Sequence, residues 1–275
     1  MTTPGTAAGE DPDAPIVAVM ARMTDRLERL PGRLGHHRVF LATYRRTTKA
    51  VWDAVGRGAF EDPRWVERWD VAFADLYLAA LDAELTDAEL NGGAGVPRPW
   101  QRAFAALPGL PPLRHVLLGI NAHVNYDLPQ ALLSVIDDAD FADADLMARR
   151  RRDHERIDDV LSSRVASEQG ELVAAGERVR VLDRLLAPLN RRASRRFLRE
   201  SRVKVWHNTL ELQAARLAGP DVQAARLAEL EALSAAKIAD LLRPGQVLLR
   251  LAVQGFGVRL PRGSMDDVRR PRSST

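Results

Sequence analysis

Apolar residues recur every three or four positions along most of this chain, and an apolar–polar alternation of period two is nowhere sustained. The first pattern is typical of amphipathic α-helices, whereas the second would indicate β-strands. Proline and glycine divide the pattern, and we expect helices at about residues 16–30, 37–56, 63 onward, 97–107, 113–136, 144–166, 179–186, 194–217 and 221–242, while 246–256 could form a last short helix. The sequence therefore predicts an all-α, single-domain bundle of about seven to nine helices with a kinked central helix.

The two ends of the chain differ from this pattern. Residues 1–15 are small and acidic and predict a disordered leader, and residues 258–275 predict a disordered basic tail, so the expected helical domain spans 16–257. The leader has neither the basic start nor the apolar block of a signal peptide. No apolar run reaches the roughly 18 residues of a membrane span. We therefore expect a cytoplasmic protein without a membrane span.

The helix expected at 113–136 is strongly apolar, yet polar side chains interrupt it. Its apolar arc consists of Val116, Leu117, Ile120, Val124 and Leu128. Asp127 falls within this arc, and His123 lies at its edge one turn earlier. Asn121 and Asn125 repeat that spacing at the other edge. Because a carboxylate facing a core needs a partner, these four residues predict a buried polar cluster.

Pro129 adds a second anomaly at the same place. It has no N–H for the carbonyl of Asn125, so the helix should kink near Leu128 and leave a free carbonyl beside the polar cluster. Two interpretations are open. In one, His123 and Asp127 bond each other and the asparagines brace neighbouring helices. In the other, the same groups hold a metal ion or a substrate.

Two further pairs repeat the His-x-x-x-acid spacing, His154 with Asp158 and His207 with Glu211. Each alone is more typical of a hydrogen bond on a helix surface. Helix bundles nevertheless bind metals through such groups on facing helices. The set His123, Asp127, Asp158, His207 and Glu211 is thus a hypothetical ligand set for one divalent ion, zinc, manganese or iron, with Asp159 as a further member. The core-facing stripe around His207 is expected to be Val203, Trp206, Leu210 and Leu217.

Other residues are placed less directly. His115 precedes His123 by eight residues but points about 80° away, so we expect it to contact another helix or water at the border of the polar cluster. His36 and His37 begin a helix and predict a cap or surface role. Tyr44 and Trp206 are amphipathic, and core packing is the more frequent role for such residues, with a position in a ligand pocket as the alternative.

Charge and composition narrow the function classes. The net charge of +3 comes almost wholly from arginine, including the run Arg149–Arg152, but aromatic residues are few around such clusters. A solvated helix face is favoured over a nucleic-acid surface. The chain has no cysteine, which excludes disulfides and thiol catalysis. Serine-hydrolase and nucleotide-binding glycine motifs are also absent from the sequence.

The segment from Gly119 to Pro129, with His115 upstream, resembles the hallmark of a bacterial family known as domain of unknown function 5995. Similar stretches are Phe60-Glu61-Asp62-Pro63-x-Trp65, Ile157-Asp158-Asp159-x-Leu161 and the helix with Trp206. The resemblance covers roughly residues 38–242. In that family the middle segment tends to have Asn before Asp, which makes Asp159 the better match. A weaker chemical similarity links the His-x-x-x-acid pairs to helical zinc phospholipases C and single-strand nucleases, which have more histidines.

These observations lead to three functional hypotheses. The first is a helical protein whose polar cluster at His123 and Asp127 is structural or binds a small-molecule ligand. The alternative is a metal-dependent hydrolase that activates water at this pair with a carboxylate from Asp158 or Asp159. The third is weak nucleic-acid binding through arginine clusters. The sequence does not predict an oligomeric state.

Overall fold

The computed structural model describes residues 14–90, 95–110, 112–174 and 181–243, without the side chains of residues 33, 87–90, 112, 113 and 161–199. The helices are α1 (Pro15–Arg29), α2 (His37–Gly56), α3 (Pro63–Leu90), α4 (Arg98–Phe104), α5 (Pro112–Ala122), the π-helix η2 (His123–Asp127), α6 (Leu128–Ser134), α7 (Ala144–Ala174), α8 (Val181–Ala218) and α9 (Pro220–Leu242). Short 3₁₀ turns lie at Gly32–Leu34 and Asp140–Ala142. No strand occurs among the described residues, which confirms the all-α prediction.

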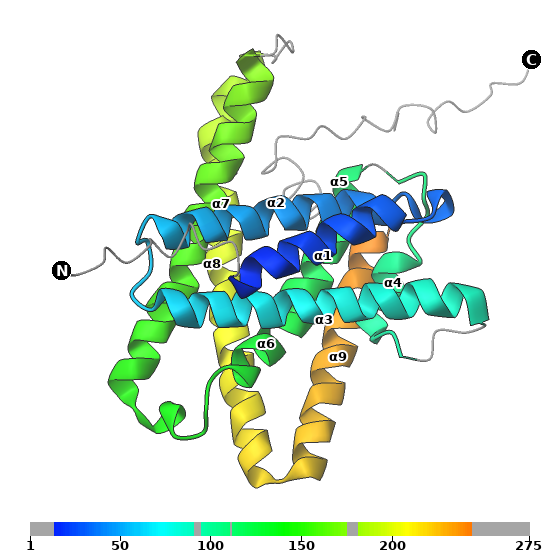
Figure 1. Cartoon of the computed structure of the whole chain (residues 1–275). Helices are drawn as coiled ribbons and strands as arrows, with labels where there is room; N and C mark the ends of the chain where they lie inside the picture. Colours follow the sequence, from blue (N-terminus) through cyan, green and yellow to red (C-terminus); the bar gives the residue numbers. More distant parts are fainter. Residues whose placement is uncertain (1–13, 91–94, 111, 175–180, 244–275) are drawn as a thin grey trace, which may run out of the picture.

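Figure 1 shows how these helices are arranged. Helix α1 lies between α2 and α3 and contacts both, while α8 and α9 form an antiparallel hairpin. The central helix, α5 with η2 and α6, passes behind α2 and α3 and contacts both. Short α4 packs on α9 and α5. The central helix is therefore enclosed by elements from both halves of the chain.

Helix α3 begins where the sequence provides a complete start signal. Asp62 Oδ1 accepts a hydrogen bond of 3.0 Å from the backbone N–H of Trp65, and Pro63 occupies the first turn. From α7, Asp153 accepts bonds from the backbone N–H groups of Glu61 (2.8 Å) and Asp62 (2.7 Å). The buried carboxylate of Asp153 thereby fixes the start of α3 against α7.

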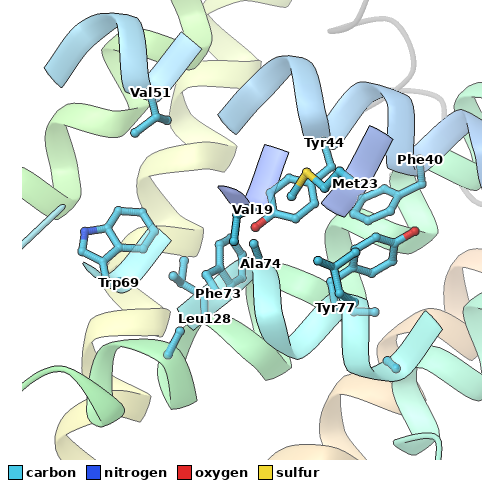
Figure 2. Packing of buried hydrophobic residues seen from close by; sticks show 14 of the residues in the cluster. Val19, Met23, Phe40, Tyr44, Val51, Trp69, Phe73, Ala74, Tyr77 and Leu128 are labelled. Carbon is cyan, nitrogen blue, oxygen red and sulfur yellow. The ribbon is translucent and has the colours of Figure 1, made fainter. Parts of the chain in front are cut away.

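The apolar core lies mainly between α1, α2, α3 and the central helix. Figure 2 shows Val19 and Met23 of α1 beside Tyr44 of α2 and beside Phe73 and Tyr77 of α3. Gly119 permits the close approach of α5 to α2, because a Cβ there would lie 2.3 Å from Cδ2 of the Phe40 ring. Large aromatic side chains therefore fill the space directly around the central helix.

Several predicted boundaries differ from the structure. Residues 179–186 and 194–217 were expected as separate helices, but α8 is continuous from Val181 to Ala218 and α7 extends to Ala174. No proline or glycine after Pro188 interrupts α8 before its end, so its helical hydrogen bonding continues. The helix expected at 246–256, the tail and residues 1–13 of the leader lie outside the described residues. None of the described helices combines the length and apolar composition of a membrane span.

The core-facing stripe of α8 was also predicted incorrectly. Val203, Leu210 and Leu217 are exposed, whereas Val205, Thr209, Leu212 and Gln213 are buried together with Trp206. The neighbouring helices bury a mixed face that also carries the polar residues Arg202 and Thr209, while three apolar residues of the expected stripe remain outside. Hydrophobic periodicity alone therefore gave the wrong orientation for this helix.

Candidate functional site

The central helix contains a π-helical turn at the polar cluster. The backbone N–H of Leu128 bonds the carbonyl of His123, five residues back rather than four. Pro129 follows directly and cannot donate, and the side-chain amide of Gln130 donates to the Tyr126 carbonyl at 2.8 Å. The kink expected near Leu128 is thus a widened turn immediately before it. Such π-turns occur frequently at functional sites.

His123 and Asp127 form the centre of the site. His123 Nδ1 and Asp127 Oδ2 share a hydrogen bond of 2.8 Å, as one interpretation of the sequence predicted, and the two residues are only 3% and 1% exposed. Trp100 Nε1 donates to the same Asp127 oxygen at 2.8 Å. Sequence reasoning missed Trp100. The available signal was that a tryptophan requires an acceptor for its N–H once it is buried.

Aromatic side chains surround the imidazole of His123. The Phe73 ring is stacked on it, with centroids 3.5 Å apart and planes 6° from parallel, and the Tyr44 ring lies edge-on at 4.5 Å. We refer to the surrounding rings as the ring cage, which consists of Phe40, Tyr44, Phe73, Tyr77 and Trp100. Four of these rings belong to α2 and α3, and Figure 2 shows them on facing sides of the core. The cage excludes water from the faces of the imidazole.

Three polar atoms of this site have no hydrogen-bond partner among the described residues. They are His123 Nε2 and the hydroxyl oxygens of Tyr44 and Tyr77, all buried. The side chain of Thr48 lies near enough to the Tyr44 hydroxyl to lower its pKa, against the larger effect of burial. An unpaired buried polar atom costs about 1–3 kcal/mol. Three such atoms lie around one imidazole.

The protonation of the pair determines what His123 Nε2 can bind. Burial lowers the pKa of His123 well below its ordinary value and raises the pKa of Asp127 well above its own, against the hydrogen bond from Trp100, which lowers it. An uncharged pair is therefore favoured. When Asp127 Oδ2 donates its proton to Nδ1, the neutral imidazole carries its own proton on Nε2. In this tautomer His123 Nε2 is a hydrogen-bond donor, and it has no acceptor among the described residues.

A second buried carboxylate is Asp70 of α3. Its Oδ2 has no partner among the described residues, and burial raises its pKa to about 7 although Arg202 lowers it. The charges of Asp70 and Asp127 both raise the pKa of Tyr44, after the larger effect of burial. The hydroxyl of Tyr44 is thus within electrostatic reach of both carboxylates. Asp70 was not identified from the sequence, since it occupies an ordinary helical position.

The asparagines of the motif do not join His123. Asn121 donates to the Leu117 carbonyl at 2.8 Å, and Asn125 donates to Asn121 Oδ1 at 3.2 Å. They were expected to brace neighbouring helices. Instead, these bonds lie within their own helix, on a different side from the His123–Asp127 pair.

The residues proposed as metal ligands lie in separate places. Arg202 Nε donates to Asp158 at 2.9 Å, and Arg202 Nη1 lies 3.2 Å from His154 Nε2. Arg202 therefore lies between His154 and Asp158, which were expected to act as a pair. His207 and Glu211 are exposed on α8, and Asp159 is exposed on α7. Within the described ranges, no group of three or more His, Asp or Glu side chains is placed to hold a metal ion. The structure therefore does not assemble the hypothetical ligand set.

Trp206 and His115 also lie apart from His123. Trp206 is buried 5.6 Å from the ring of His154, between α7 and α8. His115 lies 5.2 Å from the ring of His36, which in turn lies 4.1 Å from His37. His115 therefore contacts the N-cap of α2. His37 is buried rather than on the surface, because Phe104 of α4 stacks on its ring at 4.7 Å.

The arginine run on α7 is not a free basic face. Arg150 is buried, bonds Asp140 at 2.8 Å and lies over the Trp65 ring at 5.6 Å, which corrects its assignment to a solvated face. Arg152 bonds Glu61 at 2.8 Å. Because carboxylates already neutralise these guanidinium groups, phosphate binding here would have to displace them.

Comparison with known proteins identifies a family but no characterised relative. The model of a family of unknown function (DUF5995) matches residues 16–244. No curated protein matches the chain. No solved structure matches it.

Proposed function

The chain belongs to the family of unknown function DUF5995, and we propose that it binds a small, uncharged molecule through a hydrogen-bond acceptor at His123. The observation that carries this proposal is the buried, unpartnered Nε2 of His123, which Asp127 and Phe73 hold in one orientation. Groups that only fix helix register would be expected to satisfy one another. Here Nδ1 is paired and Nε2 is not.

The surroundings of Nε2 define the ligand class. A carbonyl or hydroxyl oxygen would accept its proton, while the hydroxyls of Tyr44 and Tyr77 can each donate or accept. The ring cage favours an apolar or aromatic body on such a ligand and opposes a net charge. Because His123 is buried, the ligand enters only when part of the cage moves. Trp100 lies on α4, the seven-residue helix, which is the shortest element of the cage.

The direct test is to identify small molecules that copurify with the protein. Wild type is isolated without denaturation, then denatured, and the released molecules are analysed by mass spectrometry beside His123→Gln. His154→Gln is the matched control, because His154 is equally buried but lies in the contact with Arg202. We expect one compound with a carbonyl or hydroxyl group in wild type and in the control, and its loss in His123→Gln.

A second experiment distinguishes ligand binding from a purely structural role. Nitrogen NMR of the histidine side chains reports whether Nε2 of His123 is protonated and whether that proton is protected from exchange. A protected Nε2–H together with a copurified compound supports the proposal. If no compound is released and His123→Gln only lowers stability, the cluster is structural.

A metal-dependent hydrolase is the second candidate, on one observation. Carboxylates that bond Nδ1 of a histidine commonly orient its Nε2 toward a metal ion. In this site a metal would have to displace the Nε2 proton and leave a buried charge. Elemental analysis for zinc, manganese and iron tests this candidate: about one equivalent in wild type, lost in both His123→Ala and Asp127→Ala, would establish it over the uncharged ligand.

A further inference from the structure

The outer face of α8 carries a regular apolar stripe that no described element covers. Val203, Leu210 and Leu217 are 49%, 41% and 68% exposed and are spaced by seven residues. His207 and Ala214, both exposed, lie between them. The five positions Val203, His207, Leu210, Ala214 and Leu217 alternate steps of four and three residues, and we call them the α8 seam. This is the spacing with which one helix packs along another.

The seam is distinct from the face that holds α8 in the protein. Val205, Thr209 and Leu212 point into the core on the opposite side, and Trp206 and Gln213 border the seam on one flank, where they are buried. Lys204 and Glu211 border it on the other flank and are exposed. Neither has an ion pair with another described residue. The seam thus has one flank buried in its own protein and one flank with opposite charges.

We infer that two copies of this chain associate by antiparallel pairing of their α8 seams. When the pair is centred between His207 and Leu210, Val203 of each copy faces Ala214 of the other, and His207 faces Leu210. Lys204 of one copy then lies close to Glu211 of the other, with an offset of about 3 Å along the helix axis. The twofold symmetry repeats this contact, so two charge pairs accompany the apolar seam.

A parallel arrangement does not provide the same complementarity. In a parallel pair, the charged flank of one helix faces the other flank of its partner, which here is Trp206 and Gln213. Those residues are buried in their own protein. The distribution of charge therefore selects the antiparallel pair of identical chains over a parallel one.

The test measures the mass of the full chain in solution by sedimentation or light scattering over a range of concentrations. We expect a concentration-dependent dimer for wild type and a monomer for Leu210→Glu, with a dissociation constant raised about tenfold or more. Leu233→Glu is the matched control, because Leu233 is 60% exposed on α9 outside the seam. Its dimer should match wild type, and circular dichroism checks that both variants remain folded.

A charge exchange tests the antiparallel register. Lys204→Glu and Glu211→Lys should each weaken the dimer, and the double variant should restore it. A monomeric wild type at all concentrations, or a dimer that Leu210→Glu leaves unchanged, overturns the inference. A double variant as weak as the single ones rejects the antiparallel pairing.

Discussion

The ring of Phe73 lies flat against the imidazole of His123, with centroids 3.5 Å apart and planes within 6° of parallel. Phe73 comes from α3 and His123 from the π-turn of the central helix. The stacking limits rotation of the imidazole out of its plane, while Asp127 limits its rotation within that plane. Two different elements thus set the direction of Nε2, which is the kind of preorganisation that binding sites require.

Replacing Asp127 should strongly destabilise the protein. In Asp127→Ala, the buried Nε1–H of Trp100 loses its acceptor and the buried Nδ1 of His123 loses its hydrogen-bond partner. We expect the free energy of unfolding to fall by about 3–5 kcal/mol. Urea denaturation measures the change. Asp25→Ala is the control, because Asp25 only pairs with Arg29 on the surface of α1 and should change stability by less than about 1 kcal/mol. Equal effects in both variants would refute a buried network.

Gly119→Ala should destabilise through overpacking. The added Cβ would lie 2.3 Å from the ring of Phe40, so either the ring or α5 must move, at an expected cost of about 1–3 kcal/mol. Gly109→Ala adds a Cβ that meets no atom within 4 Å and should be close to neutral. Thermal unfolding compares the two. The smaller side chain in Phe40→Leu should partly relieve the cost in a double variant, and failure to do so would exclude the ring as its cause.

Acid should destabilise the start of α2. Burial, and then the neighbouring His36, lowers the pKa of His37 to about 4 from an ordinary value of 6.5. As the pH falls, the unfolded chain therefore binds a proton at His37 before the folded one does. The stability that neutral, buried His37 contributes is present above pH 6.5 and is lost as the pH falls to about 4. His115, His123 and His154 have lowered pKa values and act in the same direction.

Urea denaturation between pH 4 and pH 7 isolates the contribution of His37. Its full loss amounts to about 3 kcal/mol at most. The variant His37→Gln should lose less stability than wild type over this range. Identical pH dependence in the two proteins would show that His37 titrates normally in the folded state.

Asp70 should have the opposite pH dependence. Its folded pKa of about 7 exceeds the ordinary 3.8, so the folded state keeps a proton that the unfolded chain releases, and stability falls as the pH rises from about 4 to 7. Asp70→Asn removes this penalty. We expect the variant to be more stable than wild type at pH 8, with a smaller difference at pH 4. A difference independent of pH would contradict a buried, protonated Asp70.

The sequence predicted the helices well where local signals and periodicity agree. The boundaries of α2 at His37 and Gly56 and the start of α3 at Pro63 match, because Gly58, Asp62 and Pro63 fix them locally. It failed for the orientation of α8. There the apolar stripe is exposed, and the buried face includes Arg202 and Thr209. Tertiary contacts with α6, α7 and α9 determine which side faces inward.

For the site, the sequence predicted the pair but not its surroundings. His123 and Asp127 were identifiable because a carboxylate on an apolar helix requires a partner. Trp100 and Asp70 come from other helices, and no spacing within one sequence reveals which helices meet. The same reason explains why His207 and Glu211 repeated the spacing of the pair yet lie on the exposed side of α8.

The π-turn makes the central helix sensitive to the number of its residues as well as to their identity. A deletion of one residue between His123 and Asp127 would replace the widened turn by an ordinary α-helical one, and the flanking helices α5 and α6 could keep their register. Leu128 and Leu132, which are completely buried, could then stay in the core. The change would fall on the turn that carries His123 and Asp127, so the extra residue is a requirement of the site more than of the fold.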